Sequence, residues 1–298
     1  MSLRGAALLL VAAQLLAGCA SAPAIVSWSA GAGVQDFQKP GPSQVRDEVL
    51  SESIKIGDDD CRGVVERYQP AFAGLPPTIP FIFAHGLLRD VRNHRDFARH
   101  LASWGASVYL VGHCSGGWST SRIDTAGGGA GLLARMMRQV ADASGAQQIV
   151  YGGFSAGGRA SRLAAFADAR TVGWLGLDPV DRIAAVGQTV SFPMYALFAP
   201  AQGCNAQQMG RMLTKPSVAG KALEVSGTTH CHFEAPTDFL CQVACGEPGD
   251  ATQIQVLRQR IWALATGFVR WRAGLGGDQA PLAWQAVDGV FKELILNP

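Results

Sequence analysis

A serine between two pairs of glycines is the part of the sequence with the clearest chemistry. Gly153-Phe-Ser155-Ala-Gly157 fits the G-x-S-x-G pattern, in which a sharp turn between a strand and a helix presents a serine hydroxyl. A side chain at either glycine would crowd the strand or the helix. An apolar run at 149–151 precedes the motif, and an alanine-rich segment reaching Phe166 follows it. We therefore predict that Ser155 is a nucleophile.

A serine hydroxyl needs a histidine to accept its proton and a carboxylate to hold that histidine. Only His230 and His232 follow Ser155 in the chain, and both come just after the last predicted strand. We favour His230 as the base, because Gly227-Thr-Thr connects it directly to that strand. His232 remains the alternative base.

The carboxylate is expected between the serine and the histidine. The strand predicted at 171–177 is followed at once by Asp178-Pro-Val-Asp181, whereas the next predicted strand, at 192–199, is followed by no acidic residue before Glu224. Asp178 is therefore the predicted acid, by position and by elimination. Asp181 is the alternative, although it also suits a helix N-cap or a loop carboxylate.

Acyl transfer also needs N–H donors for the oxyanion. We predict the backbone N–H groups of Ala156, at the start of the helix after the serine, and of Leu87, in the loop after the strand that ends Ala84-His85-Gly86. His85 itself is expected to shape this loop rather than to act as a base.

A second pattern of the same kind, Gly112-His-Cys114-Ser-Gly116, follows a predicted strand. A glycine-rich segment comes after it instead of a helix, so a thiolate there would lack the support of a helix N-terminus. We therefore expect Cys114 to be half of a disulfide.

These residues need elements that bring them together. Strands are predicted at 63–68, 79–84, 107–112, 149–151, 171–177, 192–199 and 222–225, and helices at 91–104, 132–143, 156–166, 207–213 and 252–272. Strands that alternate with helices predict a mainly parallel sheet covered by helices on both faces.

The first residues have the order of an export signal. Arg4 precedes the apolar run Ala6–Leu16, which is too short to span a bilayer, and the run ends Leu16-Ala-Gly-Cys19. That ending resembles a bacterial lipobox, which implies cleavage before Cys19 and a lipid on it. The alternative is an ordinary secretory signal cut near 20–24. Ala20 in place of Asp suggests the outer membrane.

We accordingly predict a signal peptide at 1–18, a flexible tether at 19–52 and one domain at 53–298, exported and anchored to the cell envelope. The formal net charge of +2 gives no reason to expect a nucleic-acid partner.

Export also bears on the cysteines. Six follow Cys19, and an even number in an oxidising compartment favours disulfides, with 15 possible pairings. The segment from His230 to Cys245 contains histidines and cysteines, but it lacks a recognised spacing of paired zinc ligands. We expect no metal and no organic cofactor.

The motifs together resemble the α/β-hydrolase superfamily, in its chlorophyllase-like and polyester-hydrolase-like serine esterase branch. The resemblance rests on 83–86, 151–158, 175–181 and 229–234, and it spans about residues 60–270. Leu-Asp-Pro-Val-Asp resembles chlorophyllases, whose acid is the first aspartate; this implies Asp178. The elbow has Phe154 where His is common, and the extra cysteines and the lipid anchor fit no plant chlorophyllase. The resemblance therefore implies ester hydrolysis but not chlorophyll as substrate.

The sequence therefore predicts a lipid-anchored serine esterase that works through an acyl-enzyme on an ester substrate. An acyltransferase with the same triad and a non-catalytic envelope lipoprotein are the alternatives. The segment from Val180 to Phe192 is too short for a helix with its connections, which predicts a fold without a large lid and an open site suited to bulky or polymeric esters.

Overall fold

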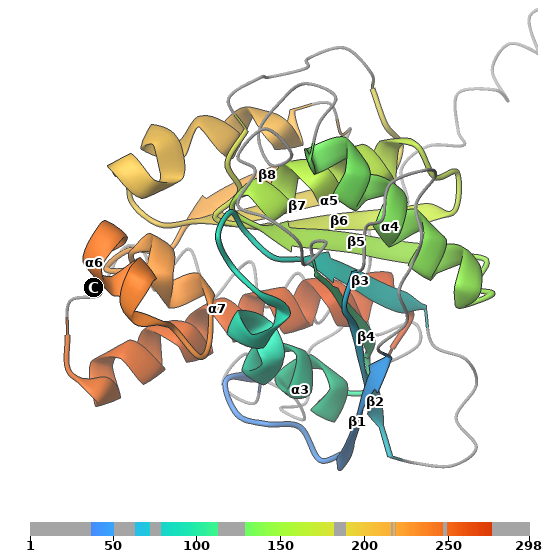
Figure 1. Ribbon diagram of the computed structural model, residues 1–298, viewed down its shortest axis with the longest axis horizontal. Helices are drawn as coiled ribbons and strands as arrows, with labels where there is room; N and C mark the ends of the chain where they lie inside the picture. The colour runs from blue at the N-terminus through green and yellow to red at the C-terminus, as the bar shows by residue number, and fades with distance from the viewer. Residues whose placement is uncertain are drawn as a thin grey trace, which may run out of the picture. The chain divides into compact units, whose positions relative to one another are not determined.

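The computed structural model describes residues 37–50, 63–71, 79–112, 129–181, 189–215, 217, 219–246 and 249–275. The described part is built around one eight-stranded sheet (Figure 1). The strands are β1 Val45–Leu50, β2 Val65–Pro70, β3 Pro80–Ala84, β4 Ser107–Val111, β5 Ile149–Phe154, β6 Thr171–Leu177, β7 Met194–Phe198 and β8 Gly220–Glu224.

Helices connect most of the strands. The α-helices are α3 Arg95–Ser103, α4 Gly129–Ala143, α5 Ala156–Phe166, α6 Phe239–Cys245 and α7 Ala251–Arg272, and the 3₁₀ helices are η1 Val91–His94, η3 Gly203–Thr214 and η4 His230–Phe233. The predicted strands and helices are all confirmed within a few residues of their ends.

The strand order is β1-β2-β4-β3-β5-β6-β7-β8. The strands from β4 to β8 run parallel, and β2 runs antiparallel to both of its neighbours. The carboxyl ends of parallel strands meet at one edge of a sheet, so the loops that follow β3, β5, β6, β7 and β8 all begin there. In open α/β sheets, this edge is where ligands bind.

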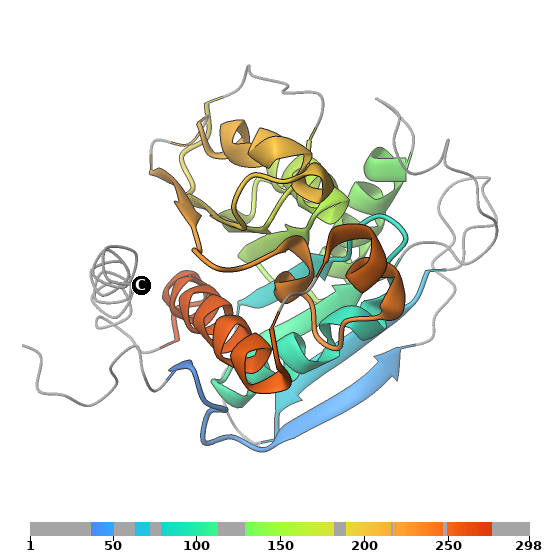
Figure 2. The same cartoon turned by 90° about the vertical axis from the view of Figure 1, so that its left-hand side faces the viewer.

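Two apolar layers hold the sheet between the helices. On one face, α3 and α7 pack against strand residues such as Phe81 and Phe83, and Figure 2 shows these two helices side by side. On the other face, α4 and α5 cover Ile82 and Tyr151. Because β3 alternates between the two layers, every residue of it is buried. This double burial explains its continuous apolar sequence and fixes the position of the loop after it.

The predicted tether at 19–52 extends too far. Residues 45–50 form β1, which pairs antiparallel with β2 at the edge of the sheet, and Phe37 is buried against Trp104. The edge position explains why the strand was missed: Arg46, Asp47 and Glu48 face solvent and interrupt the apolar pattern.

Several sequence predictions lie outside the described residues. They are the signal peptide with Cys19, the first part of the tether, Cys61, Cys114 and most of the segment predicted to hold no lid. Among the helices that the structure describes, none combines the length and the hydropathy needed to cross a bilayer.

Candidate active site

Ser155 lies at a strained turn between β5 and α5. Its φ of 53° and ψ of −125° are unusual for a residue with a side chain, and such backbone strain concentrates at functional sites. The backbone N–H of Ser155 donates to the carbonyl of Leu177 at 3.0 Å, and its own carbonyl accepts from Gly158 and Val180, each at 2.9 Å. The turn is thus tied to the end of β6.

The glycines around Ser155 are required by close packing, as the motif predicts. A Cβ at Gly153 would collide with the carbonyl of Gly157 in the helix, and a Cβ at Gly157 would collide with the carbonyls of Ala84 and His85. The helix can therefore start directly beside the end of β3. This brings the Ser155 turn next to the loop that carries Leu87.

Asp178 follows β6 and is completely buried. One carboxylate oxygen, Oδ2, lies 2.6 Å from Nδ1 of His230. The other, Oδ1, accepts from the backbone N–H of Ala199 at 3.1 Å and from Nδ2 of Asn205 at 3.2 Å. Burial raises the pKa of Asp178, while the hydrogen bonds from His230, Ala199 and Asn205 oppose that shift.

His230 begins η4, just beyond β8, and its ring is also held by packing. The ring centroids of His230 and Phe154 are 4.5 Å apart, which places the imidazole against the residue that precedes Ser155. His232 lies elsewhere in the same turn: its Nδ1 accepts a hydrogen bond from the backbone N–H of Thr229 at 2.8 Å. The contact with Asp178 is therefore made by His230.

The other residues of the predicted site have these positions. Asp181 is buried and its Oδ1 lies 3.6 Å from Nε of Arg159. His85 donates from Nδ1 to the carbonyl of Gly86 at 2.8 Å, which shapes the loop as expected, and burial lowers its pKa. Leu87, Ala156 and Ser155 line one cavity of about 130 Å³.

Ala156 is the first residue of α5, where backbone N–H groups have no acceptor within the helix. This N–H is the donor that the sequence assigns to the oxyanion, and the positive end of the helix dipole reinforces it.

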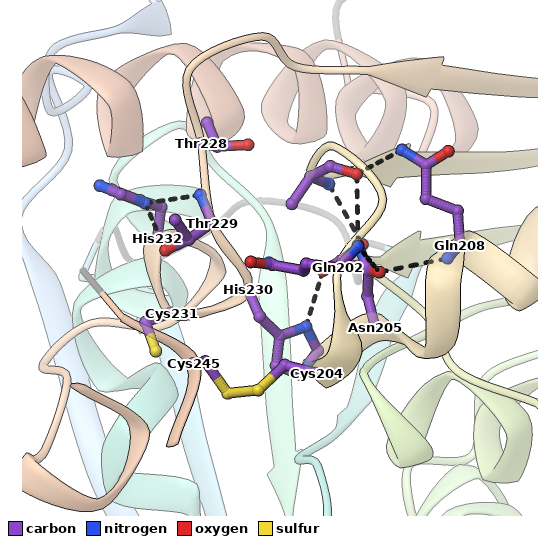
Figure 3. A network of polar contacts seen from close by, with 12 residues as sticks. Gln202, Cys204, Asn205, Gln208, Thr228, Thr229, His230, Cys231, His232 and Cys245 are labelled. Atoms are coloured by element: carbon purple, nitrogen blue, oxygen red, sulfur yellow. Dashed lines mark hydrogen bonds and ion pairs between the residues drawn. A yellow bond between two sulfur atoms is a disulfide. The ribbon is translucent and has the colours of Figure 1, made fainter. Parts of the chain in front are cut away.

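Asn205 is a residue of the candidate site that the sequence did not predict. It is fully buried, and its Oδ1 accepts from the backbone N–H groups of Gln202 and Gln208 at 2.9 and 3.1 Å (Figure 3). Its Nδ2 donates to Asp178 and to the carbonyl of Pro200. The residue after β7 that contacts Asp178 is a neutral amide, which the expectation of a carboxylate at that place does not identify.

Two disulfides join α6 to the loops of the site. Cys231, next to His230, is bonded to Cys241, and Cys204, next to Asn205, is bonded to Cys245. Figure 3 draws the Cys204–Cys245 bond beside these loops. The sulfur cluster of Cys231, Cys241 and Cys245 consists of disulfide sulfurs, which leaves no thiolates for a metal ion.

A buried ion pair connects the loop after β3 to the histidine loop, and it too was missed. Nη1 of Arg89 lies 3.4 Å from Oε1 of Glu234 and 2.5 Å from Oδ1 of Asp238, the N-cap of α6. The backbone N–H of Ala235 adds a 2.7 Å bond to the carbonyl of Asn93. These contacts fix the distance between the Leu87 loop and His230.

Comparison with known families agrees with this architecture. Residues 79–214 match the family model described as the α/β hydrolase fold. The match includes Leu87, Ser155 and Asp178. Together with the mostly parallel eight-stranded sheet, it shows that the chain has the α/β-hydrolase fold, and it indicates hydrolase activity. A comparison with curated proteins gave no match.

Proposed function

We propose that the protein is a serine hydrolase that cleaves carboxylic esters through an acyl-enzyme. The observation that carries the proposal is the buried 2.6 Å contact between Asp178 and His230, at the same sheet edge as the strained Ser155 turn. A carboxylate on Nδ1 leaves Nε2 as the basic nitrogen of the imidazole, which is the form that can take a proton from a hydroxyl.

In the proposed reaction, Ser155 Oγ attacks the ester carbonyl while His230 takes its proton. The backbone N–H groups of Ala156 and Leu87 stabilise the oxyanion. The tetrahedral intermediate expels the alcohol, which receives the proton from His230. Water, activated by the same imidazole, then releases the acid and restores Ser155. The chemistry uses neither a metal nor an organic cofactor.

We also propose, from the sequence, that the chain is exported and anchored by a lipid on Cys19. The two disulfides among the described residues support export, because such bonds persist in oxidising compartments. Labelling with radioactive palmitate in a bacterial host tests the anchor. The label should disappear in the Cys19→Ser variant. A variant that is still labelled would contradict the anchor.

The function is tested by substituting the nucleophile. We expect Ser155→Ala to lower kcat on 4-nitrophenyl acetate by about 10³-fold or more, since a triad without its nucleophile retains only the contribution of binding and the oxyanion donors. The matched control is Ser144→Ala, which changes the same residue type at the end of α4. Activity that survives Ser155→Ala would remove this serine from the mechanism.

A further inference from the structure

The cavity beside Ser155 is small and has a charged wall. Its volume of about 130 Å³ is well below the roughly 300–1,000 Å³ of sites that take drug-sized ligands. Small and aliphatic residues such as Leu87, Ala130 and Val180 form most of the lining, and Arg159 and Asp181 supply its charges. A short group that enters this cavity therefore meets a guanidinium.

Arg159 is placed by α5 on the same side as the nucleophile. It lies four residues after Ser155, and residues at that spacing are neighbours on a helix surface. Its side chain is 14% exposed, so most of it is removed from water. Among the described residues, its one ion pair joins Nε to Oδ1 of Asp181 at 3.6 Å, which exceeds the length of a hydrogen bond. No hydrogen bond or ion pair within the described part of the chain engages its two Nη groups, which are therefore open to a ligand there.

In the described part of the chain, Arg159 shares the carboxylate of Asp181 with a second arginine. Asp181 also interacts electrostatically with Arg162, whose guanidinium lies 4.4 Å from the ring centroid of Phe166. Burial lowers the pKa of Arg162 and the carboxylate of Asp181 opposes that shift. Among the described residues, the Asp181 carboxylate is thus shared between two guanidinium groups, and its contact with Arg159 is longer than a hydrogen bond.

We propose that this cavity binds a carboxylate on the acyl part of the ester, so that the preferred substrate is a monoester of a short dicarboxylic acid. The planar fork of an arginine matches the two oxygens of a carboxylate. The acyl side is favoured because Ser155 and Ala156, which would hold the acyl carbonyl, line the same cavity. The inference rests on the proposed function of Ser155.

The reaction is an ordinary hydrolysis. Ser155 Oγ forms a bond to the acyl carbon, the bond from that carbon to the alkoxide oxygen breaks, and the alcohol leaves with the proton that His230 carries. Water then cleaves the acyl-enzyme and releases a dicarboxylic acid. The distal carboxylate stays on Arg159 throughout and takes no part in bond breaking.

Matched substrates measure the preference. Monomethyl succinate and methyl butanoate both carry a four-carbon acyl group and release methanol, but only the first has a distal carboxylate. We expect Arg159→Gln to reduce the ratio of their kcat/KM values by about tenfold, the factor that one hydrogen bond between charged groups supplies. Arg159→Lys should retain part of the preference, and added salt should weaken it.

Arg135→Gln is the control, because it removes the same charge from an exposed position of α4 outside the site. The ratio should be unchanged in this variant. A ratio that is equal in wild type and Arg159→Gln would overturn the proposal. Acetoxyacetate and ethyl acetate form a second pair, in which the carboxylate is on the alcohol part of the ester. A preference for the carboxylate in this pair alone would also overturn the proposal.

A binding measurement separates this inference from the catalytic role of Ser155. In the Ser155→Ala protein, calorimetry should show monomethyl succinate binding more tightly than methyl butanoate, and Arg159→Gln added to that variant should abolish the difference. Equal binding of the two esters would overturn the inference even if Ser155 is the nucleophile. A difference that depends on Arg159 would support it even if Ser155 is not.

Discussion

Asn205 and His230 donate to different oxygens of one buried carboxylate. Such a carboxylate cannot rely on water, so its charge and its direction depend on the protein groups around it. Three successive residues after Asn205, at 206–208, have φ between 49° and 57°, a left-handed backbone that side chains disfavour. The two hydrogen bonds that Oδ1 of Asn205 accepts hold this loop in place.

The role of Asn205 is tested by Asn205→Asp, which keeps both acceptor contacts but replaces the donor with a second carboxylate. We expect kcat to fall by roughly tenfold or more, because a hydrogen bond to a charged group contributes about 1.5–3 kcal/mol. The neighbouring carboxylate further raises the pKa of Asp178, so activity should be lost at a higher pH on the acidic side.

The control is Gln207→Glu, which makes the same chemical change at an exposed position of the same loop. The measurement is kcat and KM from pH 5 to pH 9. If kcat falls at the same acidic pH in wild type and in Asn205→Asp, Asn205 has only a structural role.

At the scale of elements, α6 depends on covalent bonds. It has seven residues, and Phe239, Leu240 and Val243 on it are exposed, so little apolar burial holds it. Its disulfides close segments of 10 and 41 residues and end beside His230 and Asn205. We infer that α6 acts as a strap, a short helix whose two disulfides hold together the loop of Asn205 and the loop of His230.

Removing each disulfide by paired Cys→Ser substitution should lower the free energy of unfolding by about 3 kcal/mol for Cys231–Cys241 and about 4 kcal/mol for Cys204–Cys245, since the effect grows with the closed segment. Both variants should also lose kcat with little change in KM, measured well below the melting temperature. A full kcat in both, despite the lost stability, would show that the strap does not position the loops.

How far the sequence predicts the structure differs between elements. A buried strand such as β3 is predictable because its apolar residues are consecutive in the sequence. The turn at Ser155 is predictable because glycines stand at the nearby positions where a side chain would clash. Asp178 follows from its place after β6. Three features were not predictable, because none leaves a periodic apolar pattern in the sequence. Asn205 precedes a left-handed turn that contains no glycine, β1 is a charged edge strand, and α6 is held by disulfides.

At the scale of the whole molecule, buried histidines tie stability to pH. His94 has no exposed surface and packs against Phe83 and Phe154, and His100 packs against Trp262. Burial lowers the pKa of His100 to about 4 and lowers the pKa of His94 well below its usual value. Between about pH 6.5 and pH 4, these two histidines therefore bind protons in the unfolded chain but stay neutral in the folded chain.

We expect the free energy of unfolding to fall as the pH drops from about 6.5 to about 4. Below the unfolded pKa of 6.5 the unfolded state is stabilised by protonation, and His100 alone accounts for roughly 3 kcal/mol by pH 4. Denaturant titrations at several pH values measure the slope. His100→Leu should flatten it, and an unchanged slope would contradict this assignment.

The central claim, that Ser155 is a nucleophile activated by His230 and Asp178, is tested most directly by covalent labelling. A fluorophosphonate reacts with an activated serine, and mass spectrometry of the digested protein locates the adduct. The account predicts one adduct, on Ser155, which disappears in His230→Ala while the protein remains folded. An adduct on another residue, or none on a folded and esterolytic protein, would contradict it.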